Sequence, residues 1–183
     1  MARISLNRFT CYTATSWGGG KSKFKIENIF EIGLGSNYQD VVSHMDKVAV
    51  PGASLRGFRD YCESAKVWGG DIDERILFQE DRIQTFLIDQ TSIQDVDALL
   101  DSLKIKFDLI IDDGLHSIDA NIATLIVGTK YLNNGGWIVI EDIGENTLIF
   151  WRLITKLLKD KYTIHIFNSE SNGYIFALHK LIK

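Results

Sequence analysis

The chain has 183 residues, and its 20 basic and 24 acidic residues give a formal net charge of −4. The length and a hydrophobic content of 45% predict one domain with a sizeable core and exclude a chain that is disordered throughout. No apolar stretch predicts a membrane span or a secretory signal. Two cysteines are too few for a disulfide scaffold, and the mild acidity argues against general binding to nucleic acids or membranes, so we expect a cytoplasmic protein that binds neither.

The N-terminal residues have the composition of a flexible segment. Three successive glycines, Gly18 to Gly20, lie in a small-residue stretch over residues 13–22. No internal repeat, low-complexity tract or linker interrupts the rest of the chain. We therefore expect a flexible segment over residues 1–23 and a single folded domain over residues 24–183.

Within this domain, short apolar runs alternate with segments of helical periodicity. The runs that we expect to form strands cover residues 28–32, 66–68, 83–88, 107–111 and 136–140. Amphipathic helices are expected over 93–103, 118–132 and 148–158, and Thr91 with Gln94 has the spacing of a capping box at the start of the first. Strands that alternate with helices predict an α/β fold, in which helices flank both faces of a parallel sheet.

The C-terminal part departs from this alternation. Two strand-like runs, residues 162–167 and 174–178, are separated by six residues, which are too few for a crossover helix. These strands must therefore be antiparallel neighbours. A hairpin can simply finish the edge of a sheet, but an antiparallel hairpin after parallel strands differs from an ordinary dinucleotide-binding domain and favours a Rossmann-like methyltransferase sheet.

An acidic residue lies at the end of every expected parallel strand or shortly after it. In chain order they are Glu31, Asp71, Asp89, the pair Asp112 and Asp113, and the pair Glu141 and Asp142. The carboxyl ends of parallel strands line the crevice in which open α/β sheets bind their ligands. One such residue often only caps the next helix, but acids at all five strand ends favour a cationic ligand, hydroxyl groups or a metal.

The turn after the first strand carries a second signal. Gly33 and Gly35 would let the backbone approach a ligand closely. A dinucleotide-binding turn has a third glycine where this chain has Tyr38, and the carboxylate of Glu31 would repel a phosphate but suits an ammonium group. The turn therefore favours a cofactor without phosphate, such as S-adenosylmethionine.

The acids of the next two strands fit the rest of this cofactor. Asp71 would accept hydrogen bonds from the ribose hydroxyls, with Asp73 as the less favoured alternative, and Asp89 would reach the adenine amino group. The residues expected to bind the cofactor are Glu31, Gly33, Gly35, Asp71 and Asp89.

These motifs resemble a known family. Glu31-x-Gly33-x-Gly35 is similar to the first motif of class I S-adenosylmethionine-dependent methyltransferases, and the resemblance runs from residue 25 to the C-terminus. Residues 51–61, Gly70-Asp-Ile-Asp73, Asp112-Asp-Gly-Leu-His116 and Ile140-Glu-Asp142 resemble the branch that contains the macrocin and mycinamicin sugar O-methyltransferases and the cephalosporin-hydroxylase-like proteins. The resemblance implies O-methylation of a sugar hydroxyl.

O-methylation needs a hydroxyl group whose proton is weakened or removed. His116 is a candidate general base, and Asp113, Glu141 and Asp142 could hold Mg²⁺, which would lower the pKa of a bound hydroxyl. The resemblance implies the same roles, because the sugar methyltransferases have their metal ligands and base at the matching positions. Taken alone, a histidine before a helix is more often structural, and Glu141 with Asp142 could form a solvated turn.

Two features depart from the sugar methyltransferases. Residues 38–53 form an additional segment before the helix that follows, and Leu115 stands where those enzymes usually have serine. Asp112 is expected to be structural or to face the cofactor, and His44, His165 and His179 lack the acidic surroundings of a site. The substrate therefore does not follow from the resemblance, and a homo-oligomer stays open.

The sequence as a whole predicts a methyltransferase that uses S-adenosylmethionine, with Mg²⁺ as a second cofactor, to methylate a hydroxyl group of a small molecule such as a sugar. One alternative is an enzyme that works through His116 without a metal. The other is a non-catalytic Rossmann-like domain that binds a metabolite or a partner protein.

Overall fold

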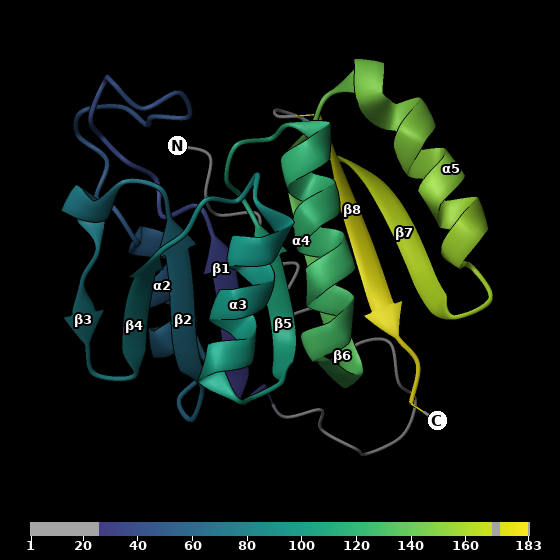
Figure 1. The fold of residues 1–183 in the computed structure, drawn as a ribbon, viewed down its shortest axis with the longest axis horizontal. Coiled ribbons are helices and arrows are strands. Elements are labelled where there is room, and N and C mark those ends of the chain that lie inside the picture. Colours follow the sequence, from purple (N-terminus) through teal and green to yellow (C-terminus); the bar gives the residue numbers. More distant parts are fainter. Residues whose placement is uncertain (1–25, 170–172, 183) are drawn as a thin grey trace.

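The computed structural model describes residues 26–169 and 173–182, which form an eight-stranded sheet flanked by helices (Figure 1). The expected flexible segment over residues 1–23 lies outside the described residues. The strands are β1 (Asn28–Ile32), β2 (Lys66–Asp71), β3 (Gln79–Glu80), β4 (Ile83–Leu87), β5 (Phe107–Asp112), β6 (Leu132–Ile143), β7 (Tyr162–Ser169) and β8 (Gly173–Lys180).

The sheet is parallel in its centre and antiparallel at both edges. Its order is β3-β4-β2-β1-β5-β6-β8-β7, and β4, β2, β1, β5 and β6 run parallel to one another. β3 is antiparallel to β4, and the hairpin of β7 and β8 is antiparallel to β6. The predicted α/β fold with a C-terminal antiparallel hairpin is therefore confirmed.

Helices cover both faces of the sheet. They are α2 (Ala53–Tyr61), α3 (Ile93–Leu103), α4 (Ile118–Tyr131) and α5 (Leu148–Leu158), with two short 3₁₀ turns, η1 (Glu74–Ile76) and η2 (Glu145–Thr147). Figure 1 shows α3, α4 and α5 on one face and α2 on the other. In the part of the chain that the structure describes, no helix is long and apolar enough to cross a membrane.

The cap of α3 differs from the prediction, although the helix begins and ends as expected. Its N-cap is Ser92, whose hydroxyl oxygen accepts a hydrogen bond of 3.2 Å from the backbone N–H of Asp95. Thr91 lies outside the helix, and its hydroxyl donates to the carboxylate of Asp89 over 2.7 Å. The capping box of Thr91 and Gln94 is therefore wrong, because the Asp89 carboxylate takes the hydroxyl that would have capped the helix.

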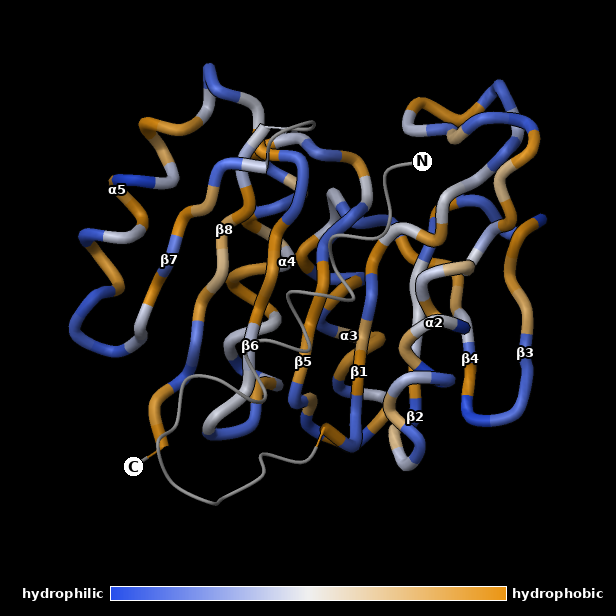
Figure 2. The backbone as a smooth tube through the Cα atoms, turned by 180° about the vertical axis from the view of Figure 1, so that it is seen from behind, coloured by the Kyte–Doolittle hydropathy of each residue, from blue (hydrophilic) through white to orange (hydrophobic). Residues whose placement is uncertain are grey.

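Alternate residues of each parallel strand pack into two cores on opposite faces of the sheet. On β1, Phe30 belongs to the core beneath α3, α4 and α5, together with Trp151 of α5. Its neighbour Ile29 belongs to the core beneath α2, with Leu55 and Phe58. Burial on both faces explains why the parallel strands are rich in apolar residues, which appear as the orange stretches of β1 and β5 in Figure 2.

The ring of Phe107 anchors the larger core and provides a test of it. Phe107 is fully buried, and its ring centroid lies 5.4 Å from that of Phe30 and 5.6 Å from that of Trp68. We expect Phe107→Ala to lower the free energy of unfolding by about 3 to 5 kcal/mol in urea titrations, because it leaves a cavity between two rings. Leu157→Ala, on the exposed side of α5, should change it by less than about 0.5 kcal/mol, and equal losses in the two variants would contradict this packing.

Candidate active site

Two adjoining cavities open at the carboxyl ends of the parallel strands. The first has a volume of about 430 Å³ and the second about 310 Å³. Gly33, Val41, Ser43 and Asp71 line both cavities, so the two share a wall. This is the edge at which open α/β sheets bind ligands, and the expected site residues gather around it with one exception, which is described below.

The turn after β1 brings the backbone to the centre of this edge. Gly33 has a φ of 95° and Gly35 a φ of 77°, a region that residues with a side chain rarely adopt. A side chain at Gly33 would also overlap the backbone carbonyl of Asp113, and the Gly33 N–H donates to the carbonyl of Gly70 over 2.9 Å. The turn after β1 therefore packs directly against the ends of β2 and β5.

Asp71, at the end of β2, holds this turn in place. One of its carboxylate oxygens accepts a hydrogen bond of 2.7 Å from the N–H of Leu34, and the other accepts one of 2.9 Å from the N–H of Asp73. The residue is only 8% exposed, yet it lines both cavities. Each carboxylate oxygen has a second lone pair, so the expected contact with ribose remains open to it.

Asp73 fixes the wall of the first cavity. Its carboxylate accepts hydrogen bonds of 2.6 Å from the Ser36 hydroxyl and 2.6 Å from Arg75 Nε. Arg75 also donates to it through Nη2 and through its backbone N–H. With the Arg75 guanidinium beside it, the pKa of Asp73 is lowered from 3.8 to about 2. Asp73 is therefore a charged structural anchor and has less capacity for ribose than Asp71.

Asp89 lines one of the two cavities, whereas Glu31 lines neither. Asp89 lines the first cavity, where its carboxylate also binds the backbone N–H and the hydroxyl of Thr91. Glu31 is 1% exposed and lies within β1, and it contributes to neither cavity wall. The structure thus brings Gly33, Gly35, Asp71 and Asp89 to the cavities and leaves Glu31 inside the sheet.

A buried polar group positions the loop after β5. Asp112 is fully buried, and burial raises the pKa of its carboxyl group. Gln90 donates to Asp112 through Nε2 over 2.6 Å and accepts from the N–H of Leu115 through Oε1 over 3.0 Å. The Gln90 side chain therefore connects the end of β4 with the loop that carries Asp113 and His116.

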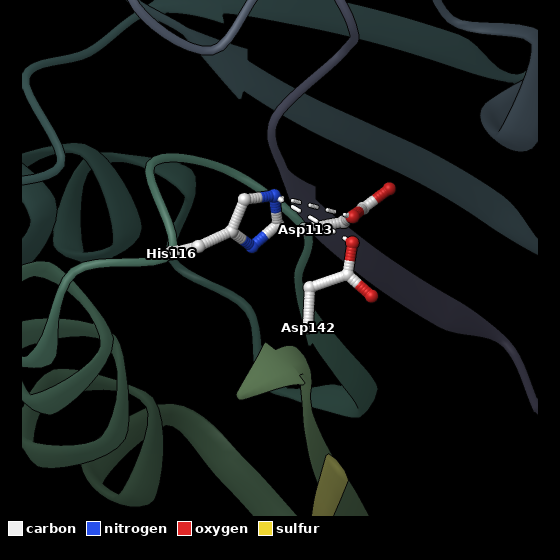
Figure 3. Close-up of side chains that lie close together, drawn as sticks. All are labelled: Asp113, His116 and Asp142. Atoms are coloured by element: carbon white, nitrogen blue, oxygen red, sulfur yellow. Dashed lines mark ion pairs between the residues drawn. The ribbon is translucent and has the colours of Figure 1, made fainter. Parts of the chain in front are cut away.

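Asp113, His116 and Asp142 form a cluster in the second cavity (Figure 3). His116 Nε2 lies 3.9 Å from Asp113 Oδ1 and 4.0 Å from Asp142 Oδ2, and the three potential ligand atoms lie within 4.8 Å of one another. Glu141 lines the same cavity but lies outside this group of three. The expected metal ligands and the expected base thus share one small cavity.

The backbone at two members of this cluster is unusual. His116 has a φ of 57° and Asp142 a φ of 52°, values that are uncommon for residues other than glycine. Such conformations cost free energy and cluster at functional sites, although Arg82 and Lys104 adopt them here at a turn and at the end of α3. This observation is independent of the motifs and supports the same residues.

The segment after the glycine turn adds residues that the sequence did not indicate. Ser43, His44 and Met45 line the second cavity together with the acidic cluster. The expectation that His44 lacks acidic surroundings is therefore wrong. His44 Nδ1 lies 2.9 Å from the carbonyl oxygen of Val41, so it must be the protonated nitrogen and Nε2 the acceptor in the neutral ring.

The lowered pKa of Asp73 predicts an acid-dependent contribution to stability. Its folded pKa lies below the ordinary value, so the stabilisation is complete above pH 4 and is lost as the pH falls from about 4 to 2. At neutral pH we expect the free energy of unfolding of Asp73→Asn to be about 1 to 2 kcal/mol lower than that of the wild type. This value allows for the partial exposure of Arg75, which weakens the pair. The difference between variant and wild type should shrink below pH 3. Asp101→Asn, at an exposed pair with Lys104, is the control and should show no such pH dependence.

Comparisons with known proteins agree with this geometry, although no family model matches the chain. The chain is 33% identical over 117 residues to 8-demethyl-8-alpha-L-rhamnosyl tetracenomycin-C 2'-O-methyltransferase of Streptomyces olivaceus, and 32% identical over 93 residues to mycinamicin VI 2''-O-methyltransferase of Micromonospora griseorubida. These matches cover 63% and 50% of this chain but only 28% and 23% of the relatives, so the chain spans about a quarter of their length.

Solved structures give the fold. The MycE methyltransferase of the mycinamycin biosynthetic pathway, in complex with Mg, SAH and mycinamycin VI, superimposes with a TM-score of 0.66 at 19% identity over 86% of this chain and 45% of that one. The plantazolicin methyltransferase BpumL, in complex with SAH and a substrate analogue, gives 0.67 at 16% identity over 97% and 84%. The chain therefore has the fold of S-adenosylmethionine-dependent methyltransferases, and its resemblance to the antibiotic sugar O-methyltransferases is confirmed.

Proposed function

We propose that this chain is a methyltransferase domain that transfers a methyl group from S-adenosylmethionine to a hydroxyl group of a small, sugar-bearing molecule. The observation that carries the proposal is the shared wall of the two cavities. A methyl donor in the first cavity lies next to any hydroxyl group held by the acidic cluster of the second. The names of the two sequence relatives, both sugar O-methyltransferases, support the class of acceptor.

The first cavity fits the cofactor in this proposal. Gly33, which lines both cavities, leaves room for a ligand at the turn, and Asp71 and Asp89 offer carboxylate oxygens to its ribose and adenine. Gly35 lines only the second cavity and would act by letting the turn bend. Glu31 would act from inside the sheet, by favouring the positive charge of the cofactor over a phosphate. S-adenosylmethionine would supply the electrophilic methyl group.

The donor set of the second cavity fits a magnesium ion. Asp113, Glu141 and Asp142 offer carboxylate oxygens, which Mg²⁺ prefers over nitrogen. A bound Mg²⁺ would act as a Lewis acid that lowers the pKa of a nearby hydroxyl group. Since oxygen ligands satisfy this ion, Nε2 of His116 stays available for a proton.

His116 would act as the general base. Its Nε2 would take the proton of the acceptor hydroxyl while the oxygen attacks the methyl carbon, and the carbon–sulfur bond would break to leave S-adenosylhomocysteine as a neutral thioether. Asp113 and Asp142, each about 4 Å from Nε2, would stabilise the imidazolium that results. Mg²⁺ would lower the pKa of the hydroxyl group and the carboxylates would favour the protonated form of His116, so both would assist the same proton transfer.

Several broader expectations belong to the same proposal. We propose one domain over residues 24–183, a cytoplasmic location, and a function without nucleic acid or membrane contact. A homo-oligomer is compatible with it. The two alternatives, an enzyme that works without a metal and a non-catalytic domain, can be distinguished from this proposal by experiment.

The cofactor is tested by calorimetry with the full chain. We expect S-adenosylmethionine and S-adenosylhomocysteine to bind with dissociation constants in the micromolar range, and NAD not to bind, because the turn lacks the third glycine and carries nearby carboxylates. Binding of NAD in place of both adenosyl ligands would refute the cofactor. Binding of the adenosyl ligands without S-adenosylhomocysteine production over a panel of sugar hydroxyl acceptors would favour the non-catalytic domain.

The roles of His116 and the acids are tested by kinetics. With an acceptor from that panel, His116→Gln should lower kcat by about 10²- to 10⁴-fold and leave the affinity for S-adenosylhomocysteine unchanged, because it removes only the base. Asp113→Asn should lower activity and weaken its dependence on Mg²⁺, whereas Asp101→Asn on α3 should do neither. Full activity of both site variants in EDTA would exclude the metal, and full activity of His116→Gln would exclude the base.

A further inference from the structure

The segment that connects β1 with α2 lies over both cavities. We define residues 37–50 as the lid. Its base is fixed by the N–H of Met45, which donates to the carbonyl of Ser36 over 2.6 Å, and by the N–H of Gly52, which donates to the carbonyl of Leu34 over 2.7 Å. The segment contains turns but no helix or strand, so its own backbone does little to hold it in position.

The lid contributes to the wall of each cavity. Val41 and Ser43 line both, Asp40 and Val42 line the first, and His44 lines the second. Val42 is 88% exposed although it borders a cavity. An apolar side chain in this place gains burial only when a ligand fills the cavity beneath it, which links the position of the lid to ligand binding.

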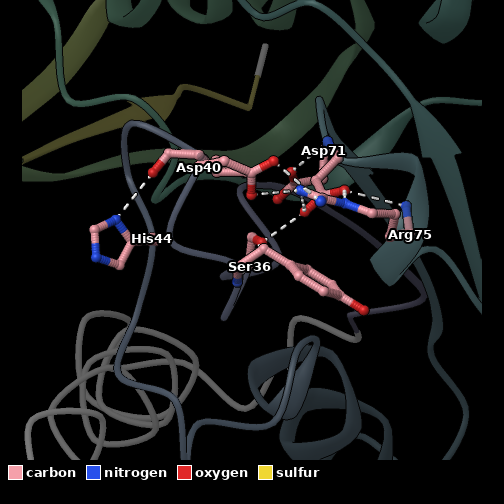
Figure 4. A network of polar contacts seen from close by, with 8 residues as sticks. Ser36, Asp40, His44, Asp71 and Arg75 are labelled. Carbon is pink, nitrogen blue, oxygen red and sulfur yellow. Dashed lines mark hydrogen bonds and ion pairs between the residues drawn. The ribbon is translucent and has the colours of Figure 1, made fainter.

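A single arginine outside the lid holds its outer part. Arg75 of η1 donates to both carboxylate oxygens of Asp40, over 3.1 Å from Nη1 and 3.0 Å from Nη2 (Figure 4). The same guanidinium lies 4.0 Å above the centroid of the Tyr38 ring. Its other edge is bound by Asp73, which is buried and fixed in turn by Ser36. Arg75 therefore joins two lid residues to the rigid end of β2.

The ion pair of Arg75 and Asp40 has favourable geometry, but its exposure to solvent weakens it. The fork of Arg75 meets Asp40 with two hydrogen bonds, and Arg75 keeps the pKa of the Asp40 carboxyl below its ordinary value. However, the Arg75 and Asp40 side chains are 40% and 69% exposed, so solvent and salt screen their attraction. An ion pair of this kind can hold a segment in one position and still release it for ligand exchange.

We propose that Asp40 and Arg75 are positioning residues that latch the lid over the two cavities and set the rate at which the cofactor leaves. This inference rests on the proposed function, because it takes the first cavity to be the cofactor site. The latch also fixes where Ser43 and His44 face the acidic cluster. When the pair breaks, the lid keeps its base, and the cavities lose their outer wall.

The test compares Asp40→Asn with Asp60→Asn. Asp40→Asn removes the charge that Arg75 holds in the lid and leaves Asp73 and Arg75 paired. Asp60→Asn removes an aspartate that is 66% exposed and pairs with Arg59 on α2, away from the cavities, which makes it a matched control. Two quantities are measured, the dissociation rate of S-adenosylhomocysteine by stopped flow and the rate of trypsin cleavage after the exposed Lys47 of the lid, without ligand.

We expect Asp40→Asn to raise both rates by about two- to fivefold, the range that corresponds to an exposed ion pair, and Asp60→Asn to raise neither. In about 1 M salt the wild-type rates should approach those of Asp40→Asn, because the Debye length falls to about 3 Å. Asp40→Glu keeps the charge, so both of its rates should lie between those of the wild type and those of Asp40→Asn.

The outcomes separate the latch from the proposed function. Equal Lys47 cleavage in Asp40→Asn, Asp60→Asn and the wild type overturns the latch whether or not a cofactor binds. Faster cleavage in Asp40→Asn with no binding of S-adenosylhomocysteine to the wild type keeps the latch and overturns its assignment to a methyltransferase cofactor. Faster cleavage with an unchanged dissociation rate overturns the claim that the latch controls cofactor release.

Discussion

The rest of the site depends on the close approach of the Gly33 backbone to the loop after β5. Only a glycine fits there, because any side chain would overlap the carbonyl of Asp113. The Gly33 N–H bonds to Gly70, and the N–H of Asp113 bonds to Ile32, so three strand ends are fixed relative to one another by the backbone alone. This contact sets the turn that faces the first cavity against the loop that carries the acidic cluster. A methyl donor and an acceptor hydroxyl could meet only if these two parts are held close together.

The acids at the strand ends divide into two groups with different physical roles. Asp73 accepts hydrogen bonds through both carboxylate oxygens and Asp112 through Oδ1, and the two residues fix the loops that surround the cavities. Asp113 and Asp142 face a cavity beside His116 and have the arrangement of a site that binds a cation or a proton. Asp71 combines both roles, since it holds the glycine turn and lines both cavities. The acidic residues at the strand ends thus include some that stabilise the fold and others that are available to a ligand.

Much of the fold could be predicted because strand and helix periods are local properties of the sequence. β1, α3 and α5 begin and end where the apolar pattern predicts, and the six-residue link predicts the hairpin of β7 and β8. The cap of α3 was missed because the competition between Ser92 and Thr91 is decided by a third residue, Asp89. Such competition depends on geometry that a spacing rule does not contain.

The site was predicted less completely, for reasons that are also physical. The cluster of Asp113, His116 and Asp142 followed from motifs at strand ends, but the left-handed backbone at His116 and Asp142 is not encoded by a glycine and could not be read from residue types. Glu31 lies inside the sheet because side chains alternate between faces of a strand, and an acid at a strand end need not reach the crevice. The lid has no helical or strand period, so the place of His44 beside the acids depends on long-range contacts such as that of Arg75 with Asp40.

The proposed reaction requires that one cavity hold a divalent ion and an acceptor hydroxyl beside the methyl donor. It is tested most directly by anomalous scattering from crystals of the full chain grown with S-adenosylhomocysteine and Mn²⁺ as a substitute for Mg²⁺. We expect one anomalous peak in the second cavity, within about 2.0 to 2.4 Å of carboxylate oxygens of Asp113 and Asp142, and S-adenosylhomocysteine in the first cavity. Density for S-adenosylhomocysteine elsewhere, or a fully bound cofactor with no anomalous peak among these carboxylates, would contradict it.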